Sequence, residues 1–125
     1  MERASDGWTT TGSVGGLQAA VTTFLRGRGM RVTGEQSGEV HARREAGWFS
    51  PVFGRLAPQR WLPYRAVIKL QHREAGVGVR AEVEAVAPPD GRRAADYRTL
   101  FARWMAELRR VLPDASPGVS AVPPG

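Results

Sequence analysis

Arginine dominates the chemically active side chains of this sequence. The 125 residues carry 18 Lys and Arg against 12 Asp and Glu, a net charge of +6, and Lys69 is the only lysine. Guanidinium groups form paired hydrogen bonds with phosphate and carboxylate, so an excess of arginine is typical of proteins that recognise anions. A GC-rich genome, which enriches Arg, Ala, Gly and Pro together, is the explanation we favour. Under either interpretation we expect acidic partners to be attracted.

Period-2 alternation places many of these cations on one face of a predicted sheet. The candidates for an anion-binding surface are His41, Arg43, Arg65, Lys69, Arg73 and Arg80. Glu45, Glu82 and Glu84 share that face, so a mixed-charge solvated surface is the alternative. Nucleic-acid binding through this face is a third hypothesis. The strand positions that would stack bases carry no aromatic residues, which counts against it.

The connection over residues 48–61 is unusually apolar for a loop, since loops are normally polar. Its candidate partner-binding residues are Trp48, Phe49, Phe53, Arg55, Arg60 and Trp61. Trp and Arg are enriched in binding hot spots, so the segment predicts contact with a protein partner or a second copy. The alternatives are a lid that closes one end of the core, and shallow insertion into a membrane surface.

Arg44 and His72 have the parity of the predicted core face, as does Tyr64. Small alanines surround them on the same face. Together the three residues suggest a small-molecule pocket between the sheet and the C-terminal helix, in the manner of a helix-grip fold. The alternative is that Arg44 and His72 lie near strand ends and reach solvent.

Little in the sequence supports catalysis. By parity His41 and His72 lie on opposite faces of the sheet, so they should not cooperate. No Ser, His and acid set and no His or carboxylate spacing typical of a metal site is apparent. There is no cysteine, which excludes disulfides and thiolate chemistry. We therefore expect no cofactor and no metal, and we favour a non-catalytic protein.

The longest element predicted to position these groups is a helix over Ala94–Leu112. Its apolar stripe holds the helical period for more than four turns. The stripe consists of Tyr97, Leu100, Phe101, Trp104, Met105, Leu108, Val111 and Leu112. A shorter amphipathic helix is predicted from Leu17, with Ser13 as its cap and its end at Gly27 or Gly29.

Alternation predicts strands over residues 30–36, 39–48, 62–72 and 77–86, and a short edge strand over 8–13. Consecutive hairpins predict an antiparallel sheet with one wet face. The expected fold is a two-layer α+β domain, with four or five strands and both helices on one face, in the order (β)-α-β-β-β-β-α.

We expect one domain over residues 1–113, with 1–7 loose, followed by a Pro- and Gly-rich tail over 114–125. No run is long and apolar enough to span a membrane, and no signal peptide is evident, so the cytoplasm is the expected location. The functional hypothesis is a non-catalytic interaction or accessory module. It would bind a protein partner or its own copy through the aromatic loop and the arginine-rich surface.

Overall fold

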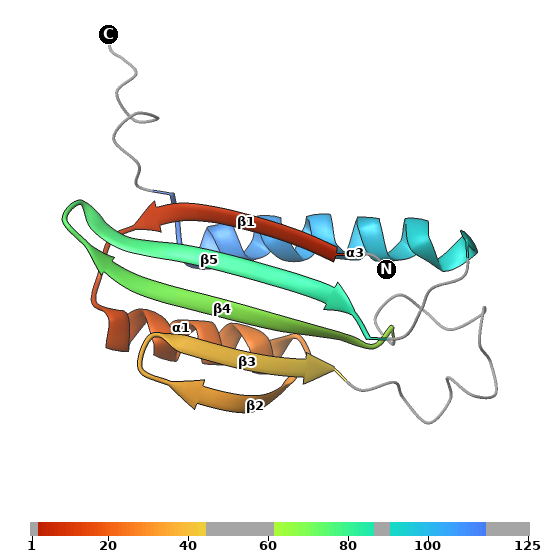
Figure 1. Cartoon of the computed structure of the whole chain (residues 1–125), viewed down its shortest axis with the longest axis horizontal. Helices are drawn as coiled ribbons and strands as arrows, with labels where there is room; N and C mark the ends of the chain where they lie inside the picture. Colours follow the sequence, from red (N-terminus) through yellow and green to blue (C-terminus); the bar gives the residue numbers. More distant parts are fainter. Residues whose placement is uncertain (1–2, 45–61, 87–90, 115–125) are drawn as a thin grey trace, which may run out of the picture.

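The computed structural model describes residues 3–44, 62–86 and 91–114. It contains two helices and a five-stranded sheet (Figure 1). The elements in chain order are β1 (Arg3–Thr10), α1 (Val14–Gly27), β2 (Arg31–Gln36), β3 (Glu39–Arg44), β4 (Tyr64–Arg73), β5 (Gly76–Ala85) and α3 (Gly91–Val111). This α+β architecture and its element order confirm the sequence prediction.

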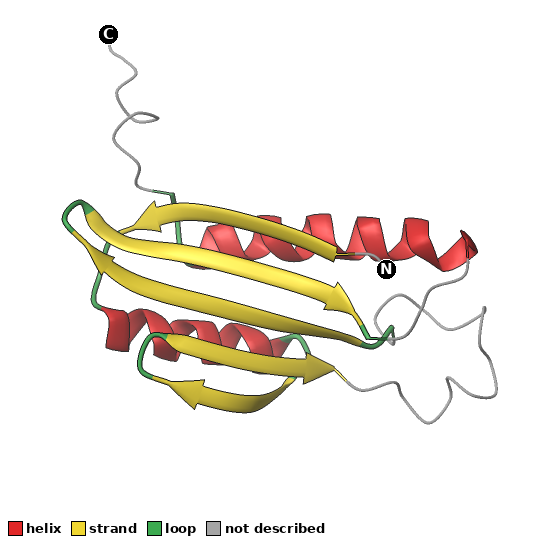
Figure 2. Ribbon diagram, viewed as in Figure 1, coloured by secondary structure: helices red, strands yellow, loops and turns green. Residues whose placement is uncertain are grey.

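The sheet is antiparallel throughout, with strand order β1-β5-β4-β3-β2. Both helices lie behind it in one layer, as Figure 2 shows. Helix α1 packs on β2, β3 and β4, while α3 packs on β1 and β5. The opposite face of the sheet carries no helix of the described chain, and we call it the exposed face.

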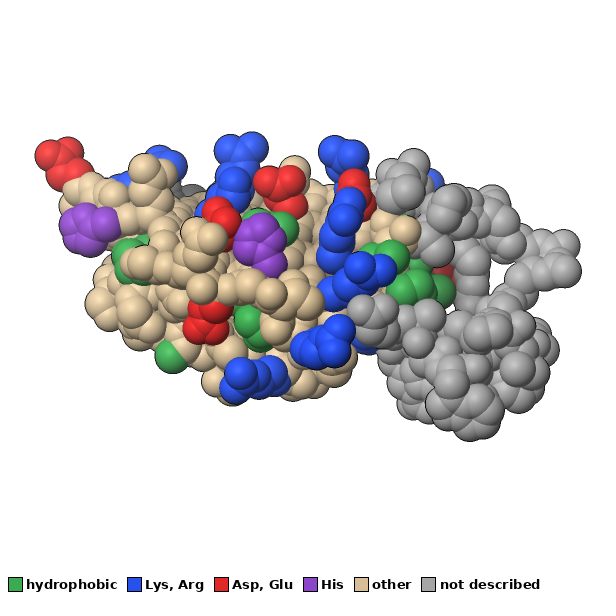
Figure 3. Space-filling view, turned by 60° about the horizontal axis from the view of Figure 1, so that its bottom comes forward, with side chains coloured by type: hydrophobic (Ala, Val, Ile, Leu, Met, Phe, Trp, Pro, Cys, Tyr) green, Lys and Arg blue, Asp and Glu red, His purple; other side chains and the backbone are tan. Residues whose placement is uncertain are grey.

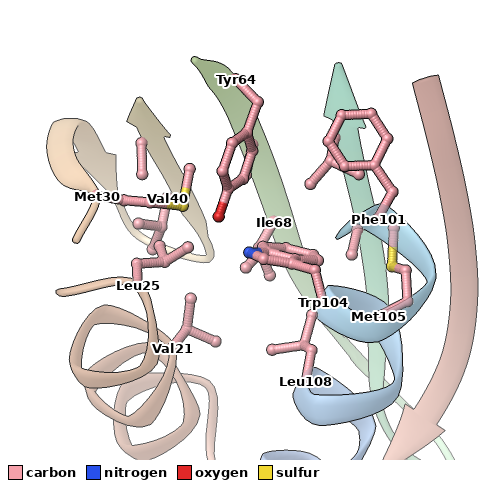
Figure 4. Close-up of a cluster of buried hydrophobic side chains, with 14 of the residues drawn as sticks. Val21, Leu25, Met30, Val40, Tyr64, Ile68, Phe101, Trp104, Met105 and Leu108 are labelled. Carbon is pink, nitrogen blue, oxygen red and sulfur yellow. The ribbon is translucent and has the colours of Figure 1, made fainter. Parts of the chain in front are cut away.

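The core lies between the sheet and the two helices (Figure 4). Alternate residues of β4 and β5 point into it, because successive side chains of a strand point to opposite faces. The strand side chains buried there are Trp8, Val40, Ala42, Tyr64, Ala66, Ile68, Leu70, Val77, Val79, Ala81, Val83 and Ala85. The predicted inward set of the β4–β5 hairpin is confirmed.

Strand β1 begins at Arg3, so the prediction that residues 1–7 are loose is wrong for residues 3–7. All eight residues of β1 pair with β5, from Arg3 opposite Glu84 to Thr10 opposite Val77. Only Trp8 is a large apolar residue in this strand, so the sequence pattern there is weak. Pairing with a distant strand, rather than local pattern, makes it extended.

Helix α1 starts as predicted, because the Ser13 Oγ accepts a hydrogen bond from the Gly16 N–H at 3.1 Å. At its other end the Arg28 N–H donates to the carbonyls of Phe24 and Leu25. Gly29 follows with φ +75°, a conformation that glycine adopts at little cost. The predicted end of this helix at Gly27 to Gly29 is therefore confirmed.

Helix α3 buries its predicted stripe from Tyr97 to Leu112, except that Leu100 is only partly buried and Val111 is exposed. Val111 is 40% exposed, because it is the last residue of the helix and no further turn covers it. Near this end the Trp8 Nε1–H donates to the Leu112 carbonyl at 2.6 Å, and Arg109 donates to Asp6. These contacts join the end of α3 to strand β1. Neither helix within the described residues is both long and apolar enough to cross a membrane.

Candidate functional site

The predicted aromatic loop lies outside the described residues. Its candidate partner-binding residues, Trp48, Phe49, Phe53, Arg55, Arg60 and Trp61, are all in the segment 45–61. The described chain resumes at Leu62, which is 5% exposed. The prediction for this loop therefore stays a prediction.

A line of charged side chains crosses the exposed face, and we call it the arginine row. Arg31 of β2 is directly opposite Arg43 of β3, which is directly opposite Arg65 of β4. Glu84 of β5 and Arg3 of β1 continue the line. Adjacent strands are about 4.8 Å apart, so neighbouring side chains in the row stand close together. Figure 3 shows basic side chains gathered in a band across this face.

Glu84 is shared between two arginines of the row. It accepts a hydrogen bond from the Arg65 Nε at 2.8 Å and another from the Arg3 Nη2 at 3.1 Å. The hydrogen bond from Arg65 lowers the pKa of Glu84, and the charges of Arg65 and Arg3 lower it further. A hollow of about 160 Å³ lies beside this group and is lined by Arg3, Ala4, Ser5, Arg65, Val67, Glu82, Val83 and Glu84.

The alignment of arginines has an electrostatic cost. Like charges directly opposite each other on neighbouring strands are destabilising. The pairs Arg31–Arg43 and Arg43–Arg65 both have this arrangement. Arg65 is paired with Glu84, and Arg31 and Arg43 have interactions of their own, so part of this repulsion is offset within the protein.

A second basic group surrounds a groove over β1, β5 and β4, which we call the basic groove. Its volume is about 880 Å³. The groove is lined by Ser5, Asp6, Gly7, Trp8, Thr9, Lys69, Gln71, Arg73, Gly78, Val79, Arg80 and Glu82. Three of the predicted anion-binding residues, Lys69, Arg73 and Arg80, are therefore brought together here.

His41, the remaining member of the predicted basic surface, contacts an acid. Its Nε2 lies 2.8 Å from the Glu39 Oε1. This hydrogen bond lowers the pKa of Glu39, and the charges of His41 and Lys69 act in the same direction. His41 is thus engaged on the exposed face, while His72 is an exposed residue of the other parity, opposite Val77. The described residues contain no group of three or more His, Cys, Asp and Glu that could hold a metal ion.

Of the three predicted pocket residues, Arg44 and Tyr64 lie together and His72 lies apart from them. Arg44 is directly opposite Tyr64, and its guanidinium lies 4.7 Å from the centre of the Tyr64 ring. The Arg44 Nε donates to the Leu62 carbonyl at 3.1 Å, and burial lowers the pKa of Arg44. His72 lies near the far end of β4 and is exposed, so it does not join the pair.

Trp104 completes the polar group at this end of the core. The Tyr64 hydroxyl points toward the Trp104 indole nitrogen in Figure 4. Both side chains are fully buried, and neither polar atom makes a hydrogen bond of good geometry among the described residues. Burial raises the pKa of Tyr64, while the charge of Arg44 and the nearby Trp104 indole N–H act in the opposite direction. Phe24 packs edge-on against Trp104 with ring centres 5.4 Å apart, and nearby Arg28 forms an ion pair with Glu107 between α1 and α3.

Arg31, Arg3 and Trp104 were not predicted as site residues from the sequence. Arg31 alternates with the inward residues Met30 and Val32, so its parity could have placed it on the exposed face. Arg3 lies before the predicted edge strand. Trp104 was assigned to the core, but helical periodicity does not say which strand residue it faces.

Comparison with known proteins bears on the fold alone. No protein-family model matches the chain, and neither does any curated protein sequence. Among solved structures the chain is similar to protein MLL2253 from Mesorhizobium loti, with a TM-score of 0.58 and 9% identity. The match covers 88% of this chain and 96% of that one, so the likeness extends over the whole fold.

Proposed function

We propose that this protein is a non-catalytic binding domain that docks an acidic surface of a protein partner on its arginine row. The observation that carries the proposal is the alignment of Arg31, Arg43 and Arg65 across three neighbouring strands. Three guanidinium groups in line suit a set of carboxylates on a partner, and charge complementarity of this kind favours fast and selective association.

The exposed face favours a protein over a nucleic acid. Carboxylates such as Glu39, Glu82 and Glu84 are interspersed with its cations, and they would repel a continuous phosphate backbone. The described strands place no Phe, Tyr or Trp on this face to stack bases. A mixed arrangement of charge suits the mixed surface of another protein.

The aromatic loop belongs to the same proposal. It leaves the sheet after Arg44, beside Arg43, and the chain re-enters β4 at Tyr64, beside Arg65. A partner placed on the arginine row therefore lies near both ends of the loop. We include Trp48 and Phe53 in the proposed interface, since large aromatic side chains contribute most to binding energy.

Charge reversal of the row tests the proposal. We expect Arg43→Glu with Arg65→Glu to weaken capture of the protein partner from host extract at least tenfold, because the variant repels acidic groups. Trp48→Ala and Phe53→Ala should weaken capture as well while the circular dichroism spectrum is unchanged. The measurement is quantitative mass spectrometry of the captured proteins at two salt concentrations.

The matched control is Arg98→Glu with Arg103→Glu, which makes the same change of charge on exposed residues of α3. The proposal predicts that this control retains the partner. Equal loss in both double variants, or capture of nucleic acid alone, contradicts it. Unfolding of the Trp48→Ala protein would instead place that side chain in the core.

Small-molecule binding between the sheet and α3 is a second candidate function, favoured by the polar atoms of Tyr64 and Trp104. A ligand oxygen could accept hydrogen bonds from both, with Arg44 close by, but because Tyr64 and Trp104 are 0% and 1% exposed the ligand would have to displace core side chains. Native mass spectrometry of protein gently purified from its host should then show an added mass of a few hundred daltons. Tyr64→Phe should lose that mass and stay folded. A bare protein, or the same added mass in Tyr64→Phe, contradicts this candidate.

A further inference from the structure

We infer that the basic groove is a separate site, and that it binds the phosphate group of a small phosphate monoester. Lys69 of β4 and Arg80 of β5 are directly opposite each other, so two cations stand side by side at its centre. Arg73 adds a third cation to the lining. Three cations around one groove fit a dianion such as a phosphate monoester better than a single carboxylate.

Lys69 and Arg80 interact only weakly with the acidic side chains of the protein. The Lys69 Nζ lies 3.9 Å from Glu39 and the Arg80 Nε lies 3.8 Å from Glu82. Both side chains are largely exposed, and exposed ion pairs of this kind are weak because water screens them. Arg73 forms no ion pair within the described part of the chain. An incoming phosphate therefore has little to displace.

Two glycines give the groove its depth. Gly7 is directly opposite Arg80, and Gly78 is directly opposite both Thr9 and Gln71. Neither glycine places a side chain on the exposed face. The Arg73 side chain lies across Gly78, where a Cβ would come within 2.5 Å of the Arg73 Nε. The missing side chain is what allows Arg73 to lie in the groove.

The lining also suits the neutral part of such a ligand. Ser5, Thr9 and Gln71 offer hydroxyl and amide groups, and Glu82 at one margin can accept hydrogen bonds from ligand hydroxyls. The volume of about 880 Å³ is within the range of small-molecule sites. The groove lies farther along β4 and β5 than the arginine row, with Glu82 and Val67 between them.

The test is a titration with inorganic phosphate, and then with glycerol 2-phosphate, at constant ionic strength. Backbone amide NMR signals of Gly7 and Gly78 report the binding. We expect saturable shifts, with the monoester bound at least as tightly as phosphate. Lys69→Ala with Arg80→Ala should weaken binding at least tenfold. Gly78→Ala, which displaces Arg73 without changing the charge, should weaken it several-fold.

The matched control is Arg43→Ala with Arg65→Ala, which removes two cations from the arginine row and should leave phosphate affinity unchanged. Shifts that do not saturate, shifts that chloride reproduces, or equal weakening in the control overturn the inference. The outcome is independent of the proposed function, because partner capture depends on the arginine row and phosphate binding on the basic groove.

Discussion

Trp104→Ala should lower the free energy of unfolding by about 3–5 kcal/mol, the cost of removing a large aromatic side chain from a core. Trp104 is 1% exposed and lies where both helices meet the sheet. It packs against Phe24 of α1, and its indole nitrogen faces Tyr64 of β4. Truncation leaves a cavity that touches all three elements, so they cannot easily close it. Urea unfolding followed by circular dichroism measures the change.

Trp104→Phe tests whether the indole nitrogen of Trp104 is hydrogen-bonded. It keeps most of the apolar volume and removes the indole N–H, which has no hydrogen-bond partner among the described residues. Removing an unsatisfied buried donor costs little, whereas removing a bonded donor leaves its partner unsatisfied. We therefore expect a loss well below that of Trp104→Ala. Because both variants lack the N–H, the test is the size of the loss in Trp104→Phe. A loss about 1–3 kcal/mol larger than its smaller volume explains would mean that the nitrogen is bonded, which would favour a ligand or a buried water at Tyr64.

Gly76→Ala should lower the free energy of unfolding by about 2–4 kcal/mol, through backbone strain and steric overlap together. Gly76 opens β5 with φ +140°, a conformation that residues with a side chain rarely adopt. A Cβ there would lie 2.5 Å from the Thr10 carbonyl oxygen of β1. That oxygen belongs to the backbone and cannot swing aside as a flexible side chain can. The measurement is again urea unfolding.

Gly15→Ala is the matched control for Gly76→Ala. Gly15 lies in the first turn of α1, and a Cβ there would meet nothing within 4 Å. Alanine is the better helix former by up to about 1 kcal/mol, so this variant should be unchanged or more stable. Losses of similar size at both glycines would show that the clash at Gly76 does not determine the result.

Local pattern predicted both helices and the strands β2 to β5, whereas most of β1 escaped it. The alternation around Arg65, Lys69 and Arg80 predicted the exposed face, and the stripe around Trp104 predicted the buried side of the last helix. Ser13 was identified as a cap from residue type and position. These features depend on the 2.0 and 3.6 residue periods and on capping, which act between residues close in sequence.

Only the tertiary structure decided which residues meet. Alternation assigns a side chain to a face but does not set strand register, so the alignment of Arg31 with Arg43 and Arg65 was not foreseeable. Arg3 joins the row because β1 pairs with β5 across most of the chain length. Tyr64 and Trp104 meet because α3 packs on β1 and β5 next to α1, which brings Trp104 to the middle of the core. These long-range contacts depend on packing the whole apolar surface at once, and no local sequence pattern encodes that.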